Sequence, residues 1–205
     1  MSTPDLARVV ILTGPSGAGK SRLATRLHRA HGWPVVRLDD FYRDGDDPAL
    51  PMIDLGHTHL VDWDDPRSWD GDAAVGALRA LVSGGRAEVP IYDIGASRAT
   101  GSALVRVGVG VGRLVVAEGI FGAEIIQRLG EEGLLHSAWC IRHNRWITFA
   151  RRLARDLSER RKAPHVLVRR GVARCRAEPG VVARMERLGA TCTSPTHAEE
   201  RLSRA

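Results

Sequence analysis

The chain has 205 residues, of which 43% are apolar, and it carries a formal net charge of +6. This length fits one domain with a buried core, the composition excludes intrinsic disorder, and no apolar run nears the roughly 20 residues of a membrane span. The first eight residues lack a basic start followed by an apolar core, so we expect no signal peptide. Three scattered cysteines are too few for a disulfide framework and favour a reducing, cytoplasmic setting.

The net charge conceals two opposed blocks. Residues 39–72 hold eleven aspartates against two arginines, whereas residues 142–187 hold thirteen arginines and one lysine against four acidic residues. A basic total can indicate nucleic-acid binding, but no RNA-binding motif or stacking platform accompanies these arginines, so we do not expect nucleic acid as a partner. The two blocks together favour a metal or hydroxyl site facing an anion clamp. Solvated surface charge is the competing explanation for any single arginine.

The first predicted elements form one compact unit. A β-branched apolar strand over residues 8–13 is followed by a glycine-rich turn over 14–20, a helix over 21–30 and a second strand over 35–38. This order predicts a right-handed βαβ unit. Residues 40–71 show little periodicity and are rich in Asp, Pro, Gly and His, which is typical of a long functional loop.

Strands and helices continue to alternate along the rest of the chain. The expected helices cover residues 73–82, 121–129 and 145–161, with helical stretches through 165–187 and a last helix capped by Ser194. The expected strands cover residues 88–92, 103–107, 113–117 and 136–141, and we interpret glycine-rich residues 108–112 as a hairpin turn. This alternation predicts one three-layer α/β domain over residues 1–205 with a mainly parallel sheet.

A phosphate-binding loop is the most specific motif, because Gly14 to Ser21 fits G-x-x-x-x-G-K-[ST] between a strand and a helix. Backbone N–H groups of such a loop point at phosphate oxygens, and its glycines relieve the steric limits on the turn. We expect Lys20 to reach the β and γ phosphates of ATP and Ser21 to offer its hydroxyl to Mg²⁺. The predicted ATP-binding residues of the loop are Gly14, Pro15, Ser16, Gly17, Ala18, Gly19, Lys20 and Ser21.

Two aspartates follow the second strand, at the edge of the sheet where parallel α/β proteins bind ligands. Either Asp39 or Asp40 could accept a proton from a hydroxyl that attacks the γ phosphate. No guanine-reading Asn-Lys-x-Asp motif is evident, which disfavours a GTPase.

Further motifs, in the same order along residues 8–162, resemble those of the uridine kinase family of P-loop small-molecule kinases. After the phosphate loop they are Asp39-Asp40-Phe41-Tyr42, the segment from Trp63 to Asp70, Pro90-Ile91-Tyr92-Asp93, Ser97-Arg98, the segment from Val115 to Ile120, and the arginine-rich segment from Arg151 to Arg160. The resemblance implies a nucleoside-kinase-like P-loop NTPase fold with a helical arginine lid over about 145–162. It also implies transfer of the γ-phosphate of ATP to a hydroxyl of a nucleoside-like acceptor.

The resemblance also implies individual roles. Asp39, rather than Asp40, would be the catalytic base, and it would form the Mg²⁺ environment together with Ser21 and Glu118. Lys20, Arg152 and Arg155 would assist catalysis, and Arg160 would bind ATP. The acceptor would contact Tyr42, Asp64, Tyr92 and Arg98. The family often forms oligomers, so a homo-oligomer is an open alternative.

Several alternatives stay open at this point. The family's base-reading histidine is replaced by Ala96, so the acceptor can be a nucleoside other than uridine or another small alcohol. Loss of the acceptor altogether would leave a non-catalytic ATP-binding regulator, and the basic C-terminal half suggests a nucleic-acid-binding ATPase as a third reading. Glu118 could instead be a structural carboxylate paired with an arginine. Trp63 and Trp69 either stack on the acceptor or anchor the loop, and residues 163–205 match no motif.

Overall fold

The centre of the molecule is a five-stranded sheet in the order β2-β7-β1-β8-β9, in which every neighbouring pair is parallel. The computed structural model describes residues 7–55, 58–108, 114–142 and 178–204. The strands of this sheet are β1 (Arg8–Thr13), β2 (Val35–Arg37), β7 (Leu114–Glu118), β8 (Leu135–Ile141) and β9 (Thr191–Thr193). All five residues of β7 are buried, as expected of a strand covered on both faces. The predicted α/β class with a mainly parallel sheet is confirmed.

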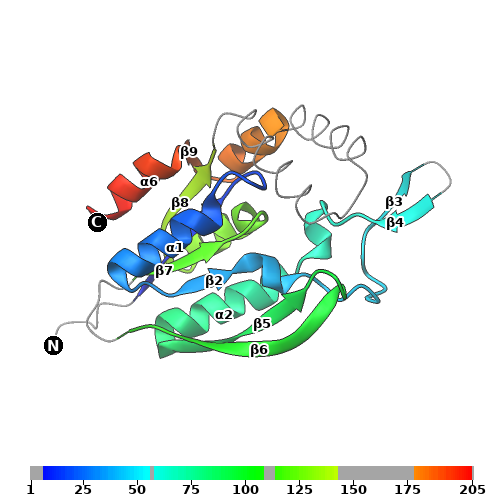
Figure 1. The fold of residues 1–205 in the computed structure, drawn as a ribbon, viewed down its shortest axis with the longest axis horizontal. Helices are drawn as coiled ribbons and strands as arrows, with labels where there is room; N and C mark the ends of the chain where they lie inside the picture. Colours follow the sequence, from blue (N-terminus) through cyan, green and yellow to red (C-terminus); the bar gives the residue numbers. More distant parts are fainter. Residues whose placement is uncertain (1–6, 56–57, 109–113, 143–177, 205) are drawn as a thin grey trace.

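Helices cover both faces of this sheet, giving three layers (Figure 1). α1 (Lys20–His31) and α6 (Pro195–Leu202) share one face. α2 (Gly71–Gly84), α3 (Ile126–Glu131) and a helix over 178–187 share the other. Successive β1 side chains alternate between the two cores, with Val9 and Ile11 on the α2 side and Val10 and Leu12 on the α1 side.

Two antiparallel hairpins lie outside the central sheet. β3 (Met52–Leu55) pairs with β4 (Thr58–Val61), and this hairpin projects away from the three layers (Figure 1). β5 (Arg86–Asp93) pairs with β6 (Arg98–Arg106). The expected hairpin across residues 108–112 is therefore wrong, because β6 turns back on β5 while β7 enters the parallel sheet beside β1.

Short turns refine several of the predicted boundaries. The second strand ends at Arg37, and a 3₁₀ turn, η1 (Leu38–Phe41), carries the aspartate pair. A second turn, η2 (Pro66–Ser68), is capped by the Asp65 side chain and precedes α2. The helix expected over 121–129 is split into a 3₁₀ turn, η3 (Gly122–Ile125), and α3.

The last described residues form part of the body of the fold. β9, which the sequence reading missed, pairs with β8, and Ser194 caps α6 by accepting a hydrogen bond from the backbone N–H of His197, as expected. Ala198 and Leu202 of α6 are buried against the α1 face of the sheet. The expected lid helix over 145–162, with Arg152, Arg155 and Arg160, lies outside the described residues.

Candidate active site

The phosphate loop joins β1 to α1 in a conformation that depends on glycine. Gly14, Gly17 and Gly19 have φ values of 139°, 82° and 99°, which L side chains rarely adopt. A Cβ at Gly14 would also collide with the carbonyl oxygen of Ile141 at the end of β8. The loop is therefore pressed against the sheet edge, with the first turn of α1 behind it.

Lys20 is buried within this loop. Its Nζ donates hydrogen bonds to the carbonyl oxygens of Gly14, at 2.9 Å, and Pro15, at 3.2 Å. These contacts hold a positive charge at the mouth of the loop. The N-terminus of α1 adds the partial positive charge of its unpaired N–H groups.

Two carboxylates from neighbouring strands approach the loop. Asp39, on the turn after β2, accepts a hydrogen bond of 3.0 Å from the backbone N–H of Ile120 to its Oδ1. Glu118 ends β7, which lies beside β2 in the sheet. The backbone after β7 can approach the turn that carries Asp39 because residue 119 is glycine. A Cβ at this position would lie 2.8 Å from Asp39 Oδ1 and 2.7 Å from Leu38 Cβ.

Glu118 lies in the least solvated part of the site. Burial raises the pKa of its carboxyl group, and the nearby charge of Asp39 raises it further, whereas the Lys20 ammonium and a hydrogen bond from the Ser21 side chain lower it. Its partners are thus the phosphate-loop residues Lys20 and Ser21. Arg37 contributes a smaller electrostatic effect, so this environment differs from the arginine-paired structural carboxylate considered above.

Asp40 faces a different environment from Asp39. Its carboxylate lies 3.6 Å from the Arg37 guanidinium. Burial raises its pKa, against the opposing effects of Arg37 and of a backbone hydrogen bond from Tyr92. Of the two aspartates, the structure brings only Asp39 into the pocket described next.

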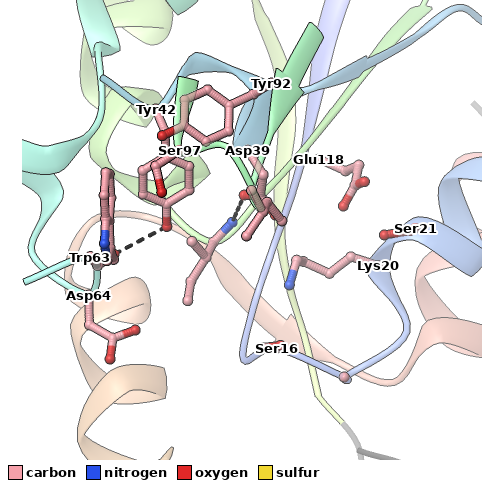
Figure 2. Close-up of a pocket in the computed structure, with 13 residues that line it drawn as sticks. Ser16, Lys20, Ser21, Asp39, Tyr42, Trp63, Asp64, Tyr92, Ser97 and Glu118 are labelled. Atoms are coloured by element: carbon pink, nitrogen blue, oxygen red, sulfur yellow. Dashed lines mark hydrogen bonds between the residues drawn. The ribbon is translucent and has the colours of Figure 1, made fainter. Parts of the chain in front are cut away.

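One pocket of about 420 Å³ joins the phosphate loop to an aromatic wall. Figure 2 shows Lys20, Ser21 and Glu118 on one side of Asp39, with Tyr42, Trp63, Asp64, Ser97 and Tyr92 on the other. The complete lining is Ser16, Gly17, Lys20, Ser21, Asp39, Tyr42, Trp63, Asp64, Tyr92, Ile94, Ser97, Glu118 and Ile120. The structure thus brings together residues expected to bind ATP, metal and acceptor.

The aromatic wall is fixed by hydrogen bonds to the backbone. Tyr42 donates its hydroxyl to the Trp63 carbonyl at 3.2 Å, and its ring meets that of Trp63 edge-on with centroids 5.7 Å apart. Tyr92 donates its hydroxyl to the Arg43 carbonyl at 3.0 Å. Both rings therefore present their faces and edges to the pocket while their O–H protons are engaged elsewhere.

The two tryptophans have different positions. Trp63 lines the pocket, whereas Trp69 is buried and donates its Nε1–H to the Leu38 carbonyl at 2.6 Å. Trp69 therefore anchors the turn that carries Asp39. Of the two alternatives, anchoring describes Trp69, whereas stacking of Trp63 on the acceptor stays a prediction.

Three lining residues were not predicted to belong to the site, although two of them lie in motifs named above, and one expected residue is not among the lining residues. Ile94 and Ser97 come from the tip of the β5–β6 hairpin, and Ile120 follows β7. Arg98, which was expected to contact the acceptor, begins β6 beside this tip and does not line the pocket. The positive φ of Ser97, which turns the chain at this point, has no signature in the residue types around it.

Comparison with known proteins gives three further observations. Residues 9–91 match a family model described as an AAA domain. The chain is 27% identical over 169 residues to the uridine kinase of Haemophilus influenzae, an alignment that covers 78% of this chain and 73% of that enzyme. It is 32% identical over 116 residues, or 55% of this chain, to inorganic pyrophosphatase TTM1 of Arabidopsis thaliana, and spans only 16% of that protein's length.

A solved structure shares the fold over nearly the whole chain. The structure, assigned as a fructose transport system kinase from Silicibacter sp. TM1040, aligns with a TM-score of 0.61 and covers 95% of this chain and 91% of its own. Sequence identity in this alignment is 18%, so the likeness concerns the arrangement of strands and helices.

Proposed function

We propose that the chain, which is similar to the uridine kinase of Haemophilus influenzae and has a P-loop kinase fold, transfers the γ-phosphate of ATP to a hydroxyl group of a small, nucleoside-like molecule. The observation that carries this proposal is the single pocket in which a phosphate loop, two strand-end carboxylates and an aromatic wall meet. A site for ATP hydrolysis alone would need no such wall, whereas a kinase must hold a second substrate in line with the phosphate.

The loop supports ATP as the phosphate donor. Its glycine conformations leave the backbone N–H groups free of side-chain obstruction, and the ammonium group of Lys20 lies beside the loop. In this proposal Lys20 stabilises the charge on the transferring phosphoryl group. Arg152 and Arg155 would add charge from the lid during transfer, and Arg160 would bind ATP.

Ser21, Asp39 and Glu118 are the side chains that would hold Mg²⁺. Their hydroxyl and carboxylate oxygens are the hard donors that Mg²⁺ prefers, and phosphates and water usually complete its coordination. When bound, the ion would neutralise charge on the phosphates. Within the described ranges, no group of three or more His, Cys, Asp or Glu side chains gathers as a separate metal cage.

Asp39 is the proposed general base. Its Oδ1 accepts a hydrogen bond from the Ile120 N–H, which fixes the carboxylate between the loop and the aromatic wall (Figure 2). From this position it would take the proton of the attacking acceptor hydroxyl. Asp64, with Tyr42 and Tyr92, would hold the acceptor, while Arg98 could take part only by moving from its present place at the start of β6.

The acceptor is proposed to carry a flat or apolar face, because the rings of Tyr42, Trp63 and Tyr92 line its half of the pocket. A nucleoside fits this requirement, and the uridine kinase relative supports it. Another small alcohol is the alternative, since Ala96 offers no side-chain hydrogen bond where the family has a histidine. A non-catalytic ATP-binding regulator is the remaining candidate.

The test is ATP consumption by the purified chain with uridine, cytidine, adenosine, inosine, D-ribose, D-fructose and glycerol. We expect one class of acceptor to stimulate ADP formation above the rate with water. Asp39→Asn should lower kcat by about 10²- to 10⁴-fold and weaken ATP binding much less, because it removes the proposed base and only one of the three proposed Mg²⁺ ligands. Asp40→Asn is the matched control, because that carboxylate lies beside Arg37 outside the pocket. ATP binding without any stimulated turnover would favour the regulator instead.

The setting of the protein is proposed to be cytoplasmic. Cys140 and Cys192 lie on paired positions of β8 and β9 and are free thiols, which suits a reducing compartment. None of the helices in the described ranges combines the length and apolar character needed to cross a bilayer. A small-molecule acceptor is the proposed partner, and nucleic acid is not.

A further inference from the structure

The backbone at Ser97 is unusual. With a φ of 51°, Ser97 is the only non-glycine residue of the described ranges in the left-handed region. A side chain in this region costs free energy and persists when its surroundings hold it there, and such residues gather at functional sites. Glycine or asparagine would fill the position at lower cost, so the serine side chain itself calls for an explanation.

The surroundings hold Ser97 from several directions. Its carbonyl oxygen accepts a hydrogen bond of 2.7 Å from the backbone N–H of Gly45. Gly45 comes so close that a Cβ there would lie 3.0 Å from the Ser97 Cβ. On the other side of Ser97, the backbone N–H of Ala99 donates to the Asp44 carboxylate at 2.8 Å. The loop after Asp39 and Tyr42 therefore clamps the hairpin tip in place.

Hydrogen bonds within the hairpin tip also stabilise its conformation. Asp93 Oδ1 accepts hydrogen bonds from the backbone N–H groups of Gly95, at 2.7 Å, and Ala96, at 3.2 Å. These bonds fix the turn that precedes Ser97. The left-handed residue is consequently part of a rigid tip, on which a side chain can be aimed with precision.

The clamped residue lines the active-site pocket. Figure 2 shows the Ser97 side chain beside the rings of Tyr42 and Tyr92. Its hydroxyl makes no hydrogen bond with any residue in the part of the chain that the structure describes. The hydroxyl protons of both tyrosines, by contrast, are donated to backbone carbonyls. Ser97 thus offers the pocket a hydroxyl that can both donate and accept.

We propose that Ser97 is a specificity-determining residue, whose hydroxyl hydrogen-bonds a polar group of the acceptor while Ile94 covers the acceptor's apolar face. This inference rests on the proposed kinase function. It assigns to the hairpin tip the selection of an uncharged acceptor that carries a second polar group besides the hydroxyl to be phosphorylated. The neighbouring Ala96 contributes no hydrogen-bonding side chain to that selection.

Three substitutions at Ser97 distinguish the contribution of its hydroxyl group from that of its backbone conformation. Ser97→Ala and Ser97→Gly both remove the hydroxyl, but glycine relieves the left-handed conformation and alanine does not. We expect both variants to raise the KM for the best acceptor of the panel by about tenfold, with kcat and the KM for ATP changed much less. Ser97→Asn, which tolerates this conformation and keeps a hydrogen-bonding group, should restore part of the loss. Ser102→Gly, on the exposed face of the same hairpin, is the matched control and should behave as wild type.

The outcomes distinguish this inference from the proposed function. Titration calorimetry with each panel compound, in the presence of a non-hydrolysable ATP analogue, measures acceptor binding independently of turnover. If wild type binds or phosphorylates an acceptor and Ser97→Gly does so equally well, the role of Ser97 is overturned while the kinase stands. If Ser97→Ala alone is impaired, the residue acts through its backbone and the proposal is wrong. If wild type neither binds nor phosphorylates any acceptor, both fail together.

Discussion

Glu118 and Lys20 are two side chains of opposite charge that the site buries away from solvent. Both side chains are buried, and each lies within the electrostatic reach of the other. The pKa of Glu118 is nevertheless raised, because the loss of hydration outweighs the attraction of the lysine. A charged carboxylate at this position therefore costs stability until a cation reaches it.

Glu118→Gln should consequently stabilise the nucleotide-free chain. Because the pKa of Glu118 is raised on folding, the folded state holds the proton more tightly, and wild-type stability falls as pH rises through that raised pKa. We expect the melting temperature of the variant to exceed that of wild type at neutral pH. The difference should shrink toward about pH 4, where the wild-type carboxyl is itself protonated.

Thermal unfolding across this range, with and without ATP and Mg²⁺, measures the effect. Ligand should stabilise wild type more than the variant, which has lost a proposed metal ligand. If wild type is more stable than Glu118→Gln at neutral pH without ligand, the assignment of Glu118 as a desolvated carboxylate is wrong.

Gly119→Ala should disable catalysis without touching the phosphate loop. The added methyl group would lie 2.8 Å from Asp39 Oδ1, so the carboxylate must shift. A displacement of this size can cost about 10²-fold in kcat, whereas the affinity for ATP should stay near wild type. Steady-state kinetics and nucleotide binding check the two halves of this expectation.

Gly76→Ala on α2 is the matched control. Apart from its chain neighbours and the adjacent backbone of its own helix, no atom lies within 4 Å of a Cβ at that position. Activity should be unchanged and stability should rise by about 0.5–1 kcal/mol, as expected for glycine replaced in a helix interior. Equal activity losses at Gly76 and Gly119 would exclude a local effect on Asp39.

Site residues differ in how far the sequence could identify them. The phosphate loop was found because it is contiguous and its residue types follow from its chemistry. The aspartates of residues 39–72 were harder to sort, because aspartate also caps helices and pairs with arginine. Asp65 and Asp70 cap η2 and α2, and Asp72 pairs with Arg128. Within this block only Asp39 and Asp64 line the pocket.

At the scale of elements, short apolar runs rich in β-branched residues located four of the five central strands but not their partners. The sequence predicted strands near β6 and β7 and joined them as a hairpin, since a glycine-rich stretch separates them. Pairing depends instead on burial: β7 is buried along its length, whereas β6 is mostly exposed. β3, β4 and β9 were missed because they are only three or four residues long and lack a clear period.

The cap of α6 offers a test at this scale. Ser194→Ala removes the side chain that accepts from the His197 N–H at 3.2 Å, which should lower the free energy of unfolding by about 1 kcal/mol. Chemical denaturation measures the loss. Thr196→Ala, in the exposed first turn of the same helix, should stay within about 0.5 kcal/mol of wild type. An equal effect at both positions would show that capping is not the cause.

At the scale of the whole molecule, the C-terminal segment completes the α1 face of the sheet. Ending the chain at Gly189 removes β9 and α6 and exposes apolar surface of α1 and β8 that Ala198 and Leu202 now cover. We expect this truncated chain to lose cooperative thermal unfolding or to aggregate. Ending it at Ser203 removes the exposed Arg204 and the terminal residue, and should leave unfolding unchanged. Cooperative unfolding of the shorter form would show that the segment is dispensable.

The position of β1 in the sheet bears on how the chain is made. β1 precedes both of its neighbours in the sheet, β7 and β8, by more than 100 residues of sequence. At ribosomal speeds its apolar run from Val9 to Leu12 waits on the order of ten seconds for a partner. Gly14 also packs against Ile141, so the nascent chain would acquire its nucleotide site only after β8 has been synthesised. Chaperones that bind short apolar segments would then have a target in β1 during this interval, and ATP binding would report that β8 has joined the sheet.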